Sequence, residues 1–302
     1  LTMEGIENNP VMYELVSELP WRDAKFAWKE WLHDYVEARY GNINNGKVHD
    51  AWLLLARSVY GAGAKIVEQG CHESVLCARP ALDVYQVSSW SEMEEFYNPD
   101  DVIRAARLMV EASHEVKSNA NFRYDLVDVT RQAIAEQARY VYDEIVAAYK
   151  AKDRKMFDYT TKRFLDILLQ QDRLLSSMSD FMVGRWLRSA RNLGLNDKER
   201  NHYEWNACVQ ITTWGNRSAA ESGGLREYAH KEWNGVLADF YYPRWKAYFE
   251  ALAATLDGKP MKDIDFYAMD EKWTLQHNVY PYEAQGDAVE FSQTAFENVF
   301  GK

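Results

Sequence analysis

The sequence has little cysteine, with only Cys71, Cys77 and Cys208 among its 302 residues. The number is odd, and the C-x5-C spacing of the first two is not a recognised metal-binding pattern. One disulfide with one free thiol would fit the composition. Three reduced, buried thiols fit it better, because free cysteine behaves as a small apolar side chain. We therefore expect these thiols in the core.

Long apolar runs and basic clusters are also missing. No stretch approaches the roughly 20 apolar residues of a membrane span, and no signal peptide is present. The chain starts at Leu1, inside what resembles a continuing element, so any localisation signal is expected upstream. Lysine and arginine are interspersed with acids, and the net charge of −11 opposes nucleic acid and anionic membranes. We expect neither as a partner.

Two further patterns are absent. No segment alternates apolar and polar residues with the period of a strand, and no internal repeat is visible. The seven histidines are scattered, without an H-x3-H pair or a paired-carboxylate ligand set. This disfavours metal-dependent hydrolysis, and we expect no metal and no cofactor.

The amino-acid composition indicates a globular protein that is rich in aromatic side chains. Hydrophobic residues make up 47% and charged residues 27% of the chain, enough for a sizeable core. Aromatic residues reach 14%, with eleven Trp and nineteen Tyr. The surplus hints at a surface that binds sugars or other rings, although Trp in a helical protein more often serves packing.

Helical periodicity covers most of the chain and predicts an all-α bundle. Between residues 62 and 97 the period fails, which predicts a long irregular connection of the kind that is often functional. A proline at position 243 predicts a kink at a packing contact. The predicted helices span residues 11–18, 21–40, 47–60, 102–117, 122–150, 154–175, 180–193, 197–213, 225–256, 263–277 and 287–300.

The opening segment differs from the rest. Residues 3–10 read MEGIENNP, with no helical or strand period, as in a loop that leaves the end of a strand. A helical bundle does not need such a segment in front of its first helix. We therefore assign residues 1–22 to the last strand, loop and helix of a preceding domain, and residues 23–302 to a complete all-α domain.

Several motifs stand out along the chain: MEGIENNPVMYEL at 3–15, ELPWR at 18–22, FRYDLVDVTRQ at 122–132, ITTWG at 211–215, YA at 228–229 and YPRW at 242–245. In these motifs the sequence resembles the alpha-N-acetylglucosaminidases, a family of glycoside hydrolases. The motifs occur in the family's order and spacing over most of the chain.

The resemblance implies a small N-terminal domain, a (β/α)8-type barrel that carries the chemistry, and a helical C-terminal domain packed on it. The family cleaves terminal alpha-linked N-acetylglucosamine with retention, which requires two carboxyl groups about 5–5.5 Å apart. Glu4 matches the nucleophile position, at the C-terminal end of a barrel strand. Glu7 is a competitor, but Glu4 precedes Gly5, where substrate can approach closely. The acid/base glutamate would lie upstream of Leu1.

The resemblance also nominates substrate-binding residues. Trp214, Leu225 and Tyr228 match positions that reach over the barrel mouth and line the sugar pocket. Trp214 directly precedes Gly215 and the polar, glycine-bearing segment 216–224, which predicts a loop. A Trp on a loop can stack on a pyranose ring. Packing between domains is the alternative role. His72, in the irregular connection, is a weaker candidate, because a lone loop histidine usually has no function.

A different class of function stays open beside this hypothesis. The chain alone could be a freestanding helical carbohydrate-binding or scaffolding module without catalytic activity. The natural glycan is also open, since heparan sulfate, mucin-type glycans and smaller glycoconjugates all carry the required sugar. The family analogy places the protein in a secreted, periplasmic or lysosomal setting. An oligomer is compatible with the sequence.

Overall fold

The regular secondary structure is helical throughout the part of the chain that its structure, a computed structural model, describes: residues 9–22, 26–61, 73–88 and 96–301. An isolated bridge of extended backbone joins Met182 and Asn234, and no named strand occurs in these ranges. The predicted all-α class is therefore confirmed for this part of the chain. The strand assigned to the start of residues 1–22 falls on residues 1–8, outside the described ranges, and stays a prediction.

Eleven α-helices occur in the described ranges, together with short 3-10 and π turns. The helices are α1 (Pro10–Glu18), α2 (Trp28–Tyr40), α3 (Gly46–Arg57), α4 (Pro99–Val116), α5 (Ala120–Lys150), α6 (Arg154–Leu175), α7 (Val183–Arg191), α8 (Asp197–Gln210), α9 (Tyr242–Leu256), α10 (Phe266–Thr274) and α11 (Ala288–Phe300). The 3-10 turns are η1 (Leu19–Trp21), η2 (Val75–Cys77) and η3 (Ser179–Phe181), and the π turns are η4 (Ser218–Ser222) and η5 (Leu237–Tyr241). Among these residues, no helix combines the length and the apolar character needed to cross a bilayer.

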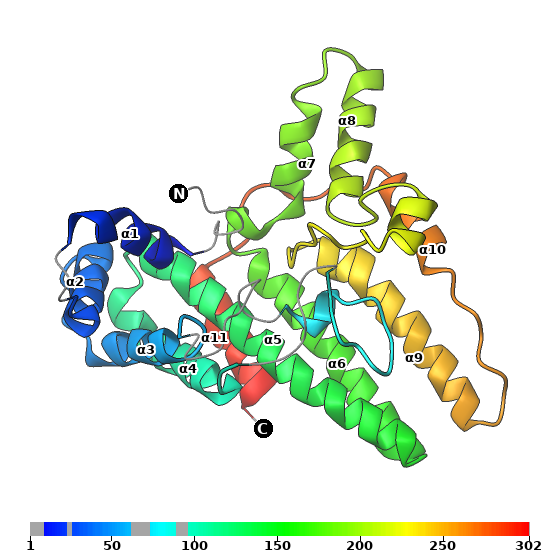
Figure 1. Cartoon of the computed structure of the whole chain (residues 1–302), viewed down its shortest axis with the longest axis horizontal. Helices are drawn as coiled ribbons and strands as arrows, with labels where there is room; N and C mark the ends of the chain where they lie inside the picture. The colour runs from blue at the N-terminus through cyan, green and yellow to red at the C-terminus, as the bar shows by residue number, and fades with distance from the viewer. Residues whose placement is uncertain (1–8, 23–25, 62–72, 89–95, 302) are drawn as a thin grey trace.

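The longest helices, α5 and α6, lie side by side through the centre of the molecule (Figure 1). Each begins at a polar N-cap: Asn119 accepts a hydrogen bond from the backbone N–H of Phe122, and Asp153 accepts one from Met156. The chain reverses between the two helices at Lys152, whose φ is +56°. Helices α4 and α11 pack on α5, and α9 packs on α6.

The buried apolar side chains form two main clusters. In the larger one, the ring of Trp245 lies 4.8 Å from Phe164 and 5.3 Å from Phe249, joining α9 to α6. The other cluster contains side chains from each of the helices α1, α2, α3 and α4. In it, the ring of Tyr35 lies 5.5 Å from both Trp31 and Trp52. Burying each such side chain stabilises the fold by roughly 1.5–3 kcal/mol.

One predicted helix is wrong in its first half. The sequence pattern predicts a helix over 225–256, whereas residues 225–235 are not helical and α9 begins only at Tyr242. Long-range contacts decide this: the N–H of Glu227 bonds to Thr212 O, and the N–H of Asn234 bonds to Phe181 O, both at 2.8 Å. Gly235 at φ +87° then precedes the helical turns.

Pro243 lies in the first turn of α9, directly after the π turn η5. Proline has no N–H to donate and its ring clashes with the carbonyl four residues earlier, so the wider π turn accommodates it. The predicted irregularity is thus present, at the start of α9 rather than inside a continuous α-helix.

The two described cysteines match the expectation of reduced core thiols. Cys77 and Cys208 are free and buried, and burial raises the pKa of both thiols, that of Cys208 to about 12. Cys71 lies outside the described residues.

Candidate functional site

Trp214 ends the turn that follows α8. Its backbone adopts a left-handed conformation with φ +60°, and its N–H donates to Val209 O at 2.8 Å. A left-handed residue at this point closes the helix and redirects the chain. The indole is not buried, since 37% of Trp214 is exposed to solvent.

The structure brings Trp214 together with the other two nominated residues. The rings of Trp214 and Tyr228 lie 4.6 Å apart at an interplanar angle of 39°, and Tyr228 is 39% exposed. The N–H of Tyr228 donates to Leu225 O at 3.2 Å, and Leu225 is half-buried. We call these three residues the aromatic corner. Glu4 and His72, the other candidates, lie outside the described residues.

A buried ion pair holds the turn that carries Leu225 and Tyr228. Glu227 has a positive φ of +53°, and its carboxylate accepts a hydrogen bond from Nη2 of Arg244 at 2.6 Å. Both side chains are only 1% exposed. Removing either partner would leave the other charge buried and unpaired, so this contact fixes the turn on α9.

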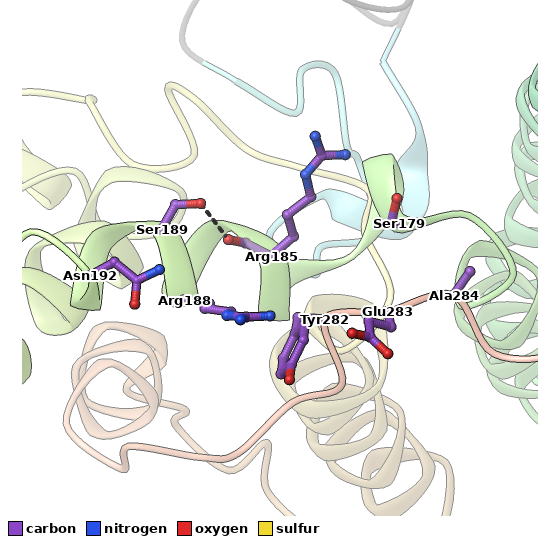
Figure 2. A pocket seen from close by; sticks show the side chains of 8 residues that line it. All are labelled: Ser179, Arg185, Arg188, Ser189, Asn192, Tyr282, Glu283 and Ala284. Atoms are coloured by element: carbon purple, nitrogen blue, oxygen red, sulfur yellow. Dashed lines mark hydrogen bonds between the residues drawn. The ribbon is translucent and has the colours of Figure 1, made fainter.

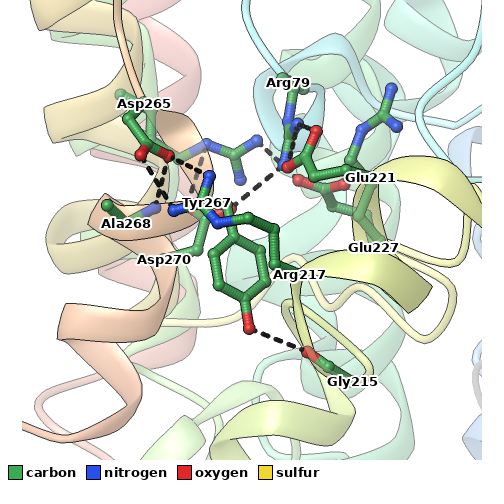
Figure 3. Close-up of polar contacts among 11 residues, drawn as sticks. Arg79, Gly215, Arg217, Glu221, Glu227, Asp265, Tyr267, Ala268 and Asp270 are labelled. Atoms are coloured by element: carbon green, nitrogen blue, oxygen red, sulfur yellow. Dashed lines mark hydrogen bonds and ion pairs between the residues drawn. The ribbon is translucent and has the colours of Figure 1, made fainter.

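The ion pair continues into a wider network (Figure 3). Asp270 of α10 lies 3.5 Å from Nε of Arg244 and 3.5 Å from Nη2 of Arg79. Arg79 also donates to both carboxylate oxygens of Glu221 at 2.8 Å. Burial raises the pKa of Asp270 to about 7, although the two guanidinium groups oppose the shift.

A second set of contacts fixes the chain just after Trp214. Arg217 donates to both carboxylate oxygens of Asp265 at 2.9 Å, and its guanidinium lies 4.6 Å from the ring centre of Tyr267. The Tyr267 hydroxyl donates to Gly215 O at 3.3 Å (Figure 3). Both sides of the aromatic corner are therefore tied to the rigid helices α9 and α10.

This supporting network was not predicted from the sequence. Arg244 was identified only as part of the YPRW motif, and Glu227, Arg79 and Asp270 were not singled out at all. A single signal was available: Arg244 sits in an aromatic stretch beside Trp245, where a charge requires a buried partner. Which carboxylate it pairs with depends on contacts distant in sequence.

The sequence of the chain is similar to those of known proteins. The model of the alpha-N-acetylglucosaminidase (NAGLU) C-terminal domain matches residues 31–298. The chain belongs to this family. Alpha-N-acetylglucosaminidase from Homo sapiens is 32% identical over 300 residues, which are 97% of this chain and 38% of that protein.

Solved structures of a relative share the fold of this chain. A family 89 glycoside hydrolase from Clostridium perfringens superposes with a TM-score of 0.90 at 30% identity, over 96% of this chain and 33% of that one. It was solved as a variant with two Glu-to-Gln substitutions in complex with its substrate GlcNAc-alpha-1,4-galactose, and also with 2-acetamido-1,2-dideoxynojirimycin. The present chain thus spans about a third of the length of these relatives.

The chain has a further contact beside the aromatic corner. Nδ1 of His230 lies 3.1 Å from Glu227 O and 3.8 Å from Oε1 of Glu73. Glu73 in turn accepts hydrogen bonds from the N–H and hydroxyl of Ser88 at 2.7 and 2.8 Å. The described end of the irregular connection therefore contacts the turn that carries Tyr228.

The same chain has a polar groove of about 460 Å³ between α7 and the segment near Tyr282 (Figure 2). The guanidinium of Arg188 lies 3.8 Å from the ring centre of Tyr282, and Arg185 pairs with Asp180. The hydroxyl of Ser189 donates to Arg185 O at 2.9 Å. The groove lacks the paired, solvent-facing rings of the aromatic corner, which makes the corner the better candidate for binding a sugar.

Proposed function

We propose that the complete protein to which this chain belongs is a retaining, exo-acting alpha-N-acetylglucosaminidase, and that this chain forms the helical wall of its sugar pocket. The single observation that carries the proposal is the aromatic corner: two rings that face solvent, held by buried charges, in a family whose Clostridium perfringens member is solved with a GlcNAc substrate.

Each residue of the aromatic corner has a role in this proposal. An exposed indole such as Trp214 offers an apolar face for the C–H groups of a pyranose ring, and the Tyr228 hydroxyl can hydrogen-bond to sugar hydroxyls. Leu225 supplies an apolar contact beside them. Family membership supports these roles, and so does the convergence of the three residues.

The chemistry is assigned to the opening segment and to an upstream barrel domain. Glu4 is the proposed nucleophile, and a second glutamate upstream of Leu1 is the proposed acid/base. The two Glu-to-Gln substitutions in the substrate complex of the relative are in keeping with a mechanism of two carboxyl groups. A chain with only one of the two cannot complete the reaction.

The test uses the complete protein and an aryl alpha-N-acetylglucosaminide. We expect Glu4→Gln to abolish product release without affecting folding, since an amide cannot form the glycosyl-enzyme intermediate. Glu7→Gln is the matched control, three residues away in the same segment, and should keep most of the turnover. Near-normal turnover by the Glu4→Gln variant would end the assignment. Residues 1–302 alone should show no hydrolysis, and measurable activity of this chain would mean that the site is misplaced.

A further inference from the structure

A cluster of metal-ligating side chains lies between α2 and α3, at the other end of the molecule from α10 (Figure 1). His33 and Glu37 are four residues apart on α2 and so share one face of that helix. His49 comes from the first turns of α3 and faces them. The potential ligand atoms of the three residues all lie within 4.8 Å of one another.

The contacts within the cluster are close. Nε2 of His49 lies 2.6 Å from Oε1 of Glu37, and the rings of His33 and His49 stack at 4.3 Å with an interplanar angle of 10°. The side chains of Glu37 and His49 are 16% and 17% exposed, whereas that of His33 is 61% exposed. Two ligands are thus held in place, and the third is open to solvent.

The backbone holds the two helices in a fixed relation at this point. Helix α2 ends at Tyr40 and is capped by Gly41, which has φ +82°, and α3 begins at Gly46 behind its N-cap Asn45. The Asn45 side chain accepts hydrogen bonds from Lys47 and Val48, and the N–H of His49 donates to Asn45 O. A short, capped connection reduces the conformational entropy that a bound ion would have to restrict.

We propose that His33, Glu37 and His49 form a binding site for a divalent transition-metal ion, with zinc as the ion of choice. Two imidazoles and one carboxylate are a recurring ligand set for zinc, and a solvent molecule completes the tetrahedron where a site is open. The histidine pattern sought in the sequence was a pair on one helix. Here the second ligand on α2 is a carboxylate, and the second histidine comes from α3.

The geometry requires only a small closure. Two ligands at about 2.1 Å from a tetrahedral zinc ion are roughly 3.4 Å apart. The ligand atoms here are at most 4.8 Å apart, and the exposed imidazole of His33 can rotate toward the other two. The ion would link α2 to α3 within the cluster that also contains α1 and α4.

Calorimetric titration of the purified chain with zinc chloride tests the proposal. We expect one saturable zinc site per chain. His33→Gln should weaken zinc binding by at least about tenfold, because substitutions around a metal commonly cost that much or more. This variant is chosen because His33 is exposed, so its loss leaves the fold intact. His202→Gln is the matched control: His202 is also exposed, on α8, and packs on Trp205 outside the cluster.

Thermal unfolding provides a second measurement. Zinc should raise the melting temperature of the unaltered chain and of His202→Gln, because a ligand that binds only the folded state stabilises it. It should not raise that of His33→Gln. Absence of saturable zinc binding to the unaltered chain would overturn the proposal, and so would equal zinc binding by His33→Gln and the unaltered chain. Neither result depends on glycosidase activity.

Discussion

Trp214 leaves more than a third of its surface exposed although its backbone is in a left-handed conformation. This conformation is unfavourable for a bulky residue, and its cost persists only where the surroundings impose it. Packing alone is a poor reason to keep an exposed ring there. The position and exposure of the side chain are in keeping with the proposed contact with a sugar.

The first prediction concerns the proposed sugar-stacking role of Trp214. In the complete protein, Trp214→Ala should raise KM for an aryl alpha-N-acetylglucosaminide about two- to thirteenfold, as expected for the loss of roughly 0.5–1.5 kcal/mol of ring contact. Trp28→Ala is the control, since Trp28 is 40% exposed on α2. An unchanged KM for Trp214→Ala would favour the packing role. Steady-state kinetics on both variants decides between them.

Asp172 gives a prediction for pH. Its carboxylate accepts hydrogen bonds from Gly235 N, Ala238 N and Asn234 Nδ2 at 2.7, 3.1 and 2.8 Å, yet burial raises its pKa to about 6. A raised pKa means that the folded state holds the proton more tightly than the unfolded state. The resulting stabilisation is complete below the ordinary pKa of about 4 and is lost as pH rises through about 6.

Other carboxylates affect the overall curve, so the measurement is a difference. The free energy of unfolding of the unaltered chain, relative to that of Asp172→Asn, should be larger at pH 5 than at pH 8, by of order 1 kcal/mol. Denaturant titrations at the two pH values measure it. A relative stability that rises with pH would contradict the assigned direction of the pKa shift.

At the scale of elements, the turn between Thr212 and α9 depends on the pair Glu227–Arg244. Arg244→Met should lower the free energy of unfolding by about 3–5 kcal/mol, because Glu227 would be left buried without its partner. The double variant Glu227→Gln with Arg244→Met should lose less than the single variant. Denaturant unfolding of both variants, of Glu227→Gln alone and of the unaltered chain measures the coupling between the two side chains.

The matched control for this prediction is on the same helix. Lys246→Met removes a charge that lies 3.9 Å from Glu250 on the exposed face of α9, and such a pair contributes little. If Lys246→Met and Arg244→Met destabilise the chain equally, the buried pair does not hold the turn in the way described.

The elements also show where sequence reasoning succeeds. The helix predicted over 154–175 coincides with α6, because an N-cap aspartate and a sustained apolar period mark it locally. The helix predicted over 225–256 is wrong in its first half, because the N–H of Glu227 bonds to Thr212 O instead of continuing a helix. Local patterns predict helices well, and contacts between distant segments determine the exceptions.

The candidate site also contains some residues that were predicted from the sequence and others that were not. Trp214, Leu225 and Tyr228 were nominated through the family resemblance, and the structure brings them together. The charges beneath them were not foreseen, since pairing across the fold leaves no trace in spacing. Glu4 and His72 stay predictions, because they lie outside the described residues.

At the scale of the whole molecule, Trp21 is 89% exposed beside α1, in the segment assigned to a barrel domain. If that domain covers it, Trp21→Ala should lower the melting temperature of the complete protein but not that of residues 1–302 alone. Leu195→Ala is the control, because Leu195 is 88% exposed in the connection between α7 and α8 and should affect neither. Thermal unfolding of both variants and of the unaltered sequence, each in the complete protein and in residues 1–302, makes the comparison. Equal melting temperatures of Trp21→Ala and the unaltered sequence in the complete protein would count against burial of Trp21.

Helix α5 should make thermal unfolding of the molecule cooperative. Its 31 residues extend for about 46 Å, and they supply Leu126 to the core formed by α1–α4 and Val141 to the core around Trp245. Because α5 contributes to both cores, unfolding of one core removes part of the other. Heat should therefore melt both cores in one cooperative step, with equal calorimetric and van't Hoff enthalpies.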